Sequence, residues 1–389
     1  MLTRPHACVL ALGALLGACH DDSQSGTLVK HPPLSCADAV IEEDPLGAGG
    51  LPDLCAFGPR SCFVSGASDG GDTPLSISVD WAPTDDYALV GGDGEVRLLR
   101  IDREANKLTK LAIYGDQPGR ITVAWSPDGQ LALSVSSDVR LFRVTREPPA
   151  LTELARVVTH AGAILSVSWS PDGRAALTTG KDASVRLMAV GPAEGTLVEV
   201  ARFTGHTNRV FAASWSPDGK HVLTGGEDGT ARMLEVDVQA GTLRELASVA
   251  HDAQVVPVAW SPRGDALVGT WVPCHSAVEL VALDPSAGTM SVPTTFAHHE
   301  SGLRALEWSP DGSYAISGGH DDTIRFLARH DGTMRVLDVW PQGVLGVHAL
   351  SWSPDGQYFL HAASQADRVT LVDARACVVC QRGLELAGP

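Results

Sequence analysis

The sequence is poor in basic residues, and its N-terminal apolar run is short. It contains 29 Lys and Arg residues against 46 Asp and Glu residues, which gives a formal net charge of −17. Nucleic acids are bound largely through neutralisation of phosphates by Lys and Arg, so this balance argues against a nucleic-acid partner. It also argues against attraction to anionic lipids through a basic surface. The apolar run, residues 7–18, is shorter than the roughly 20 residues that a membrane-spanning helix needs.

Motifs for cofactors and metals are also scarce. The glycine-rich stretch Gly225–Gly229 lacks the Lys-Ser/Thr ending of a phosphate-binding loop. Cys377 and Cys380 have the two-residue gap of redox and zinc motifs, but the sequence has no second such pair and no thioredoxin-like βαβ context. We therefore expect no cofactor and no metal.

The N-terminus has the features of an export signal. Arg4 and His6 precede the apolar run, which is short and ends in small residues. The run closes with Leu-Gly-Ala-Cys at residues 16–19, which resembles the lipobox of bacterial lipoproteins. The resemblance implies cleavage before Cys19 and a lipid on that cysteine. The alternative is an ordinary secretory signal cleaved after Ala18, with no lipid.

The chain is expected to have three regions. Residues 1–18 form the signal peptide, and residues 19–59, which show no helical or strand periodicity, form a tether. Residues 60–389 form the folded domain. His20 follows the cysteine where an inner-membrane lipoprotein would carry an aspartate. We therefore expect an exported protein anchored by lipid alone in the outer membrane, facing the periplasm or the cell surface.

The whole sequence has 44% hydrophobic and 19% charged residues, a composition typical of globular proteins, and a repeat fills the chain after the tether. Its tryptophans are spaced by 44 to 48 residues, a propeller-sized period, at Trp81, Trp125, Trp169, Trp215, Trp260, Trp308 and Trp352. Five of them open an unbroken Trp-Ser-Pro-Asp-Gly, in which Ser, Pro and Gly occupy the places that a type I turn prefers. Each tryptophan is therefore expected to end a strand.

The positions around each tryptophan alternate as in a strand. Residues two and four before it are mostly large and apolar, and residues one and three before it are mostly small or polar. Further strands are expected at His221–Thr224, Ala231–Val236 and Leu243–Val249. Four strands in each of seven repeats predict an all-β fold, a seven-bladed β-propeller of four-stranded antiparallel blades, which leaves no long free edges.

The repeat resembles WD40 over about 315 residues. A histidine lies nine residues before the tryptophan at His160, His206, His251 and His299, and an aspartate lies thirteen after it at Asp138, Asp182, Asp228 and Asp321. The third strands end in pairs such as Leu-Leu or Met-Leu instead of Trp-Asp. The Trp-Ser-Pro-Asp-Gly motif is also similar to that of TolB-like propellers, so the subfamily stays open.

A hydroxyl, histidine and aspartate recur together in three repeats. The sets are His160, Thr178 and Asp182; His206, Thr224 and Asp228; and His299, Ser317 and Asp321. Such trios can activate a nucleophile, but catalysis needs one site and this arrangement is repeated. The resemblance implies instead a structural hydrogen-bond network that holds blades together. Third-strand arginines at 97, 140, 186, 232, 325 and 368 could likewise form an anion-binding ring, but inter-blade ion pairs are the favoured interpretation.

The cysteines predict disulfides. Apart from Cys8 and Cys19, the thiols are Cys36, Cys55, Cys62, Cys274, Cys377 and Cys380, an even number in an exported chain; Cys274 has no assigned role. We expect residues 61–65 to complete the last blade by pairing with a strand near Val369–Val372. Cys62 would then bond to Cys377 or Cys380.

We expect a monomeric, non-catalytic platform that binds a protein, peptide or glycan. By its resemblance to WD40 propellers, the binding face carries the loops before the first strands and between the second and third strands. The expected contact residues are Lys181, Arg209, Glu227, Trp271, His275 and His320. In the fifth repeat, Trp271–His275 is an insertion, either an exposed anchor or a packed segment. The rival function is a propeller hydrolase or lactonase with a site at the mouth of the central channel.

Overall fold

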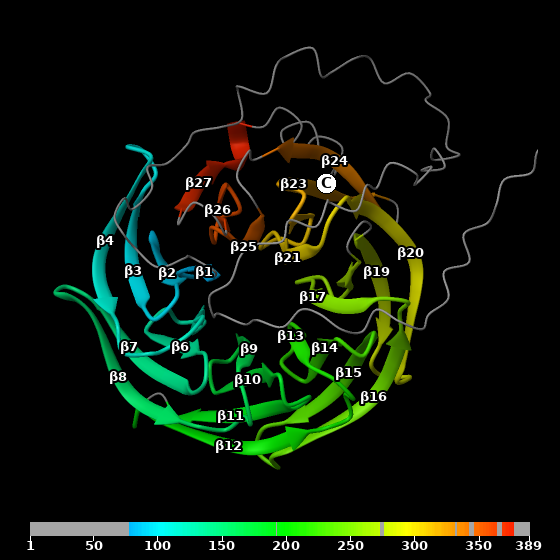
Figure 1. Ribbon diagram of the computed structural model, residues 1–389, viewed down its shortest axis with the longest axis horizontal. Helices are drawn as coiled ribbons and strands as arrows, with labels where there is room; N and C mark the ends of the chain where they lie inside the picture. Colours follow the sequence, from blue (N-terminus) through cyan, green and yellow to red (C-terminus); the bar gives the residue numbers. More distant parts are fainter. Residues whose placement is uncertain are drawn as a thin grey trace, which may run out of the picture. The chain divides into compact units, whose positions relative to one another are not determined.

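The fold is a ring of seven antiparallel sheets around a common axis (Figure 1). The computed structural model describes residues 78–191, 193–272, 276–330, 333–341, 346–363 and 368–376, all within the compact unit Leu51–Pro389. Among these residues, six sheets have four strands and the last has three. The prediction of an all-β, seven-bladed propeller of mostly four-stranded blades is therefore confirmed.

The strands follow one another along the chain, blade by blade. Blades 1 to 4 consist of β1 (Ser78–Trp81), β2 (Tyr87–Gly91), β3 (Val96–Asp102) and β4 (Lys107–Tyr114); β5 (Thr122–Trp125), β6 (Leu131–Val135), β7 (Val139–Arg146) and β8 (Pro149–Val157); β9 (Ile164–Trp169), β10 (Ala175–Gly180), β11 (Val185–Gly191) and β12 (Thr196–Phe203); β13 (Val210–Trp215), β14 (His221–Gly226), β15 (Thr230–Asp237) and β16 (Thr242–Ala250).

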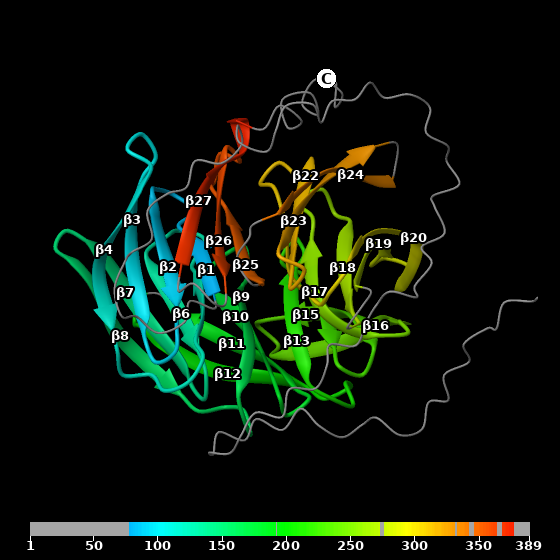
Figure 2. The ribbon, with the colours of Figure 1, turned by 45° about the horizontal axis from the view of Figure 1, so that its top comes forward.

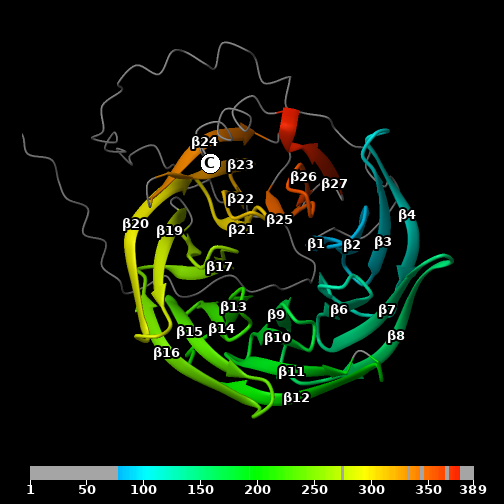
Figure 3. The same ribbon diagram turned by 180° about the vertical axis from the view of Figure 1, so that it is seen from behind.

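The remaining blades continue this order. Blades 5 to 7 consist of β17 (Gln254–Trp260), β18 (Ala266–Trp271), β19 (Ser276–Asp284) and β20 (Thr289–His299); β21 (Leu303–Trp308), β22 (Tyr314–Gly319), β23 (Thr323–His330) and β24 (Thr333–Pro341); β25 (Val347–Trp352), β26 (Tyr358–Ala363) and β27 (Arg368–Asp373), followed by the short 3-10 helix η2 (Ala374–Ala376). The view from behind shows the first strand of each labelled blade innermost and the fourth outermost (Figure 3).

Every repeat tryptophan ends the first strand of its blade, as the turn motif predicts. In blade 2, the Ser126 hydroxyl donates to Asp128 at 2.6 Å and accepts the Leu131 N–H at 2.8 Å. The Gly129 N–H donates to the Ser126 carbonyl at 2.8 Å, which is the hydrogen bond of a type I turn. Gly129 has φ of 67°, a conformation that favours glycine and explains the last residue of the motif.

Four of the repeat tryptophans also join their blade to the one before it. The Nε1–H groups of Trp125, Trp169, Trp215 and Trp308 each donate, at 3.1 Å, to the carbonyl oxygen of the residue that precedes the tryptophan of the previous blade. Buried apolar residues form seven clusters, and each cluster combines side chains of two neighbouring blades. Burial of these faces between blades is what stabilises the ring.

Blade 7 packs on blade 1 and closes the ring. The Trp81 N–H donates to the Ser351 hydroxyl at 2.9 Å, and Val79 and Trp81 share a cluster with Leu360 and Leu371. Figure 2 shows β25, β26 and β27 lying beside β1 and β2. The proposed closing strand at residues 61–65, and the proposed bridges of Cys36, Cys55, Cys62, Cys377 and Cys380, fall outside the described residues.

Five third-strand arginines, at positions 97, 140, 186, 232 and 325, pair with acids of their own blade, which corrects the expectation of inter-blade ion pairs for them. The side chain of Arg368 lies outside the described residues. Arg186 on β11 contacts Asp182 in the preceding turn at 2.8 Å and Glu199 on β12 at 2.9 Å. Blades 2 and 4 repeat this arrangement with Glu153 and Glu245. The partner glutamate follows each arginine by thirteen residues, because the hairpin between the third and fourth strands sets that register.

Candidate functional site: the loop face and its basic cluster

One face of the ring carries the segments before the first strands and the turns between the second and third strands. Backbone hydrogen bonds join these two parts in several blades. Lys181 N–H donates to Ala163 O at 2.9 Å, and His320 N–H donates to Gly302 O at 2.8 Å. We call this surface the loop face. It is the surface on which the sequence places the expected contact residues.

The three histidine trios lie just beneath the loop face. In blade 4, His206 Nδ1 lies 3.0 Å from Asp228 Oδ2 and its Nε2 lies 2.9 Å from the Thr224 hydroxyl. The same contacts occur in blades 3 and 6, within the sets His160, Thr178, Asp182 and His299, Ser317, Asp321. Each histidine lies at or after the end of one blade's fourth strand, on the segment that leads to the next blade. The aspartate also accepts the backbone N–H of the residue that follows the histidine. The network thus ties this segment to its blade.

The pKa values of the trio histidines and aspartates are shifted by burial and by their hydrogen bonds. Burial lowers the pKa of His206, against an opposing hydrogen bond from Asp228, so the imidazole is neutral near pH 7. Burial acts in the opposite direction on Asp182, but hydrogen bonds from Ser184 and His160 outweigh it and hold the pKa of that carboxyl below its usual range.

We expect His206→Ala to lower the free energy of unfolding by about 1–3 kcal/mol, because Thr224 and Asp228 would lose a buried partner. His160→Ala should have a similar effect. Chemical denaturation followed by circular dichroism measures both. A histidine variant that keeps full stability but loses a binding or catalytic activity would contradict a structural role.

Two blades replace parts of the trio. In blade 2, Gln117 takes the place of the histidine. Its side-chain amide donates to Asp138 Oδ1 at 2.9 Å, and the Ser134 hydroxyl donates to Gln117 Oε1. In blade 5, which lacks the aspartate, His251 lies 2.7 Å from Glu279. The sequence pattern missed Gln117, which a search for any hydrogen-bonding side chain before the strand would have found.

The structure separates the expected contact residues into two groups. Lys181 is exposed in blade 3. In blade 4, Arg209 and Glu227 form an ion pair at 3.4 Å and so partly neutralise each other. Trp271 and His320 lie in blades 5 and 6, at a shared cluster described next. His275 lies outside the described residues, as does Cys274.

Trp271 is half-buried, which favours the packed segment over the exposed anchor, the two alternatives that the sequence leaves open. It ends β18, and its indole packs so closely on Gly302 that a Cβ there would lie 1.7 Å from Trp271 Nε1. The guanidinium carbon of Arg304 lies 5.9 Å from the centre of the Trp271 ring. Trp271 therefore acts as a platform for a neighbouring arginine.

Arg304, His320, His348 and Arg120 form a basic cluster with Trp271 on the loop face. Arg304 Nε donates to His320 Nε2 at 3.2 Å, and the rings of His320 and His348 are 5.3 Å apart. Burial and the Arg120 charge lower the pKa of Arg304. Burial, His320 and the two arginines lower the pKa of His348 to about 4, so this imidazole is uncharged at neutral pH.

Arg304 and His348 were missed because they lie on strands, four residues before the tryptophan, where most repeats carry a large apolar residue. The register of β21 with β22 skips Arg304, and that of β25 with β26 skips His348. Such β-bulges turn a side chain out of the regular ladder. The sequence signal that could have found them is a polar residue, Arg304 or His348, at a position where other repeats have a large apolar residue.

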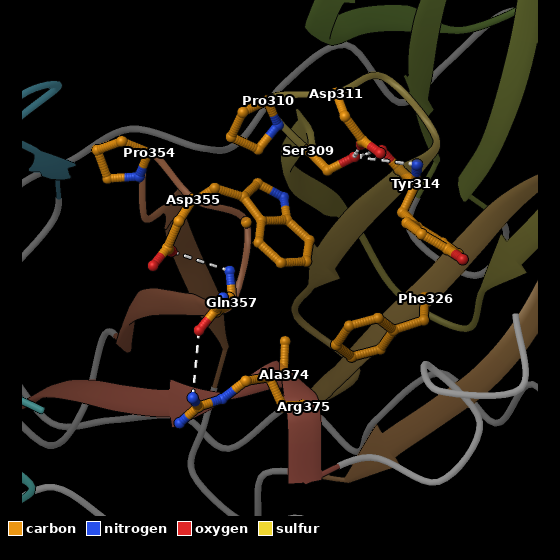
Figure 4. A pocket seen from close by; sticks show the side chains of 12 residues that line it. Ser309, Pro310, Asp311, Tyr314, Phe326, Pro354, Asp355, Gln357, Ala374 and Arg375 are labelled. Carbon is orange, nitrogen blue, oxygen red and sulfur yellow. Dashed lines mark hydrogen bonds between the residues drawn. The ribbon is translucent and has the colours of Figure 1, made fainter. Parts of the chain in front are cut away.

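A cavity of about 670 Å³ lies between blades 6 and 7, at the end of the first strands away from the loop face (Figure 4). Its carboxylates belong to the turn motif: Ser309 donates to Asp311 at 2.7 Å, and Ser353 donates to Asp355 at 2.6 Å. The same contact is made in blade 3, where Ser170 donates to Asp172. These acids therefore serve the turns.

The part of the chain that the structure describes contains no group of three or more His, Cys, Asp or Glu side chains placed to hold a metal ion. Nor does any helix within those residues have the length and apolarity that a bilayer crossing requires.

Comparison with known proteins identifies the repeat. Residues 152–187, 197–233 and 290–326 match the family described as "WD domain, G-beta repeat". The solved "WD40 beta propeller domain of Doa1" is similar in fold, with a TM-score of 0.64 and 19% identity over 80% of this chain and 96% of that chain. No curated protein matches the sequence. Together with the ring of blades, these findings show a seven-bladed β-propeller in which three segments match the WD40 repeat.

Proposed function

We propose that this protein is a non-catalytic binding platform whose loop face holds a protein or peptide partner. WD40 propellers generally bind proteins or peptides and usually act as scaffolds without catalysis. The basic cluster carries the proposal. Its residues occupy positions whose residue type differs from blade to blade, whereas the histidine trios recur in several blades. Residues that the fold does not require are available for recognition.

Site-specific photo-cross-linking tests which face binds. A photoreactive phenylalanine analogue is placed at position 181 on the loop face or at position 220, which is exposed in the turn after β13 at the other end of the blade. We expect the partner to be captured from position 181 and not from position 220. Capture from position 220 alone would contradict the assignment of the loop face.

We also propose that the protein is exported and anchored through a lipid on Cys19, which supplies the membrane attachment that its acidic surface does not. The supporting observation is the short apolar run that ends in Leu-Gly-Ala-Cys at residues 16–19. A platform held at a membrane meets its partner in two dimensions, which raises the effective concentration of both.

Replacement of the lipidated residue should release the protein from the membrane. We expect Cys19→Ser to move nearly all of the protein from the detergent phase to the aqueous phase in a phase-partition assay, because acyl chains would be the only anchor. Cys8→Ser, a change within the proposed signal peptide, should leave partition unchanged. Retention of the Cys19→Ser protein in the detergent phase would refute the lipid anchor.

A further inference from the structure

We propose that the loop face recognises acidic peptide segments, in which a carboxylate pairs with Arg304 and a nearby apolar side chain rests on Leu165 and Phe211. This inference depends on the proposed function, since it assumes that the loop face is the binding surface, and it specifies the chemistry of the partner. It follows from three features of the loop face: a guanidinium held in place, an unbalanced positive charge, and an apolar arc on blades 3 and 4, across the central axis from the cluster (Figure 1).

The guanidinium of Arg304 is held from two sides. Its Nε donates to His320, and Trp271 packs near its plane, with 5.9 Å between the guanidinium carbon and the ring centre. Its terminal nitrogens make no hydrogen bond with the described residues, and part of the side chain remains open to solvent. Two such nitrogens match the two oxygens of a carboxylate. Because the side chain is already ordered, little conformational entropy is lost when a ligand binds.

The positive charge of the cluster is not balanced from within. Arg120 is exposed, forms no ion pair with a carboxylate among the described residues, and acts on Arg304 by repulsion. Asp322, whose charge reaches His320, already accepts the Gly346 N–H at 2.6 Å. In a chain of net charge −17, two neighbouring arginines without a carboxylate partner are an exception. A bound carboxylate would relieve their repulsion.

An apolar arc continues the ring of bulged positions on the loop face. The residue four before the tryptophan is bulged out of the first strand in blades 3 and 4, as it is in blades 6 and 7. In blades 3 and 4 this residue is Leu165 or Phe211, and both are half-buried outside the seven core clusters. At these bulged positions, blades 3 and 4 thus carry apolar side chains, and blades 6 and 7 carry Arg304 and His348.

The basic and apolar positions of the loop face together favour one class of partner. A neutral glycan offers no charge to the arginines, and the net charge of −17 disfavours a nucleic acid. A peptide with Asp or Glu near Leu or Phe satisfies both halves of the ring. Such segments occur on protein surfaces and in unfolded tails, where a short stretch can be read without further folding.

A peptide array tests the inference. The full chain is applied to capped octapeptides in which a pair of Glu residues is separated by zero to three residues from Leu or Phe, with matched peptides that carry Gln for Glu. We expect Glu peptides to bind about tenfold or more tightly than their Gln matches, as measured by fluorescence anisotropy. Arg304→Gln should weaken binding by a similar factor, and Arg304→Lys by less, since Lys keeps the charge but not the fork.

Lys220→Gln, which removes an exposed charge at the other end of the blade, should leave peptide affinity within about twofold. Circular dichroism verifies that each variant is folded. The inference is wrong if no Glu peptide binds, if Gln peptides bind as tightly, or if Arg304→Gln has no effect. It is also wrong if sodium phosphate displaces the peptide as well as unlabelled peptide does, because the apolar arc would then contribute nothing. If any of these results accompanies partner capture from position 181, the loop face remains the binding surface and only the acidic chemistry is refuted.

Discussion

Trp215→Ala should lower the free energy of unfolding by about 3–5 kcal/mol, the range for removal of a buried aromatic side chain. The indole is only 7% exposed and packs in the cluster that combines blades 3 and 4. Its Nε1–H also donates to Ser168 O of the previous blade at 3.1 Å. The change therefore opens a cavity at a blade interface and leaves a carbonyl without its partner. Urea unfolding followed by circular dichroism measures the loss.

Trp215→Phe separates the two contributions. It keeps most of the ring volume and removes the hydrogen bond, so we expect a smaller loss of about 1–2 kcal/mol. Val158→Ala, at a side chain that is 71% exposed, should change stability by less than about 0.5 kcal/mol. Equal losses for the Ala and Phe variants would show that packing of the indole between blades is not what stabilises the interface.

Asp80→Asn should raise stability at pH 8 by about 1–3 kcal/mol while changing it little near pH 4. Asp80 lies on the innermost strand of blade 1, and burial raises its pKa to about 7 despite hydrogen bonds from Trp125 and Ser351. The folded protein therefore holds a proton on Asp80 between about pH 4 and pH 7 that the unfolded chain has released. Stability contributed by this group falls as pH rises through that window and stays low above it.

Asparagine removes this proton uptake while its carbonyl oxygen can still accept the Trp125 N–H, which Asp80 accepts at 2.7 Å. Solvent reaches part of Asp80, so the expected gain is smaller than the roughly 4 kcal/mol to which a rise from 3.8 to about 7 corresponds. Burial and Asp80 also raise the pKa of Glu307, so Asp80→Asn combined with Glu307→Gln should show the weakest dependence on pH.

Asp116→Asn is the control for these measurements, because the Asp116 side chain is 89% exposed. Its stability should follow that of the parent protein at every pH. The histidine trios are common to all of these proteins. The difference between variant and parent therefore reports Asp80 together with its effect on Glu307. If Asp80→Asn and the parent lose stability equally between pH 5 and pH 8, a raised pKa at Asp80 is refuted.

The fold was predictable because the sequence repeats its signals. The tryptophan, the turn after it and the alternation before it occur in nearly every repeat, so an error in one blade is corrected by the others. The arginine pairing was wrong because only the strand register distinguishes Glu199 of the same blade from an acid of the next. The sequence left Trp271 open between an exposed anchor and a packed segment, because its packing depends on Gly302 of the following blade, some thirty residues later.

The basic cluster was not predictable in the same way. Lys181, Arg209 and His320 follow from loop positions, and His320 does lie in the cluster. Arg304 and His348 depend on β-bulges, which are set by how the first and second strands pair and leave no fixed residue type in the sequence. The alternation before each tryptophan predicts that the residue four positions earlier is buried in the core. Where a β-bulge interrupts the strand pairing, that prediction fails and a site residue is missed.

Closure of the ring has a consequence for how the chain folds. Tryptophan hydrogen bonds between successive blades join residues 45 to 49 positions apart, whereas the bond from Trp81 to Ser351 joins residues 270 apart. Six of the seven interfaces can thus form between neighbours in sequence, and one cannot. The entropic cost of bringing distant chain segments together therefore arises mainly at one interface, that between blades 7 and 1. We expect the blades to assemble first as an open arc, with the meeting of blades 7 and 1 as the slow final step.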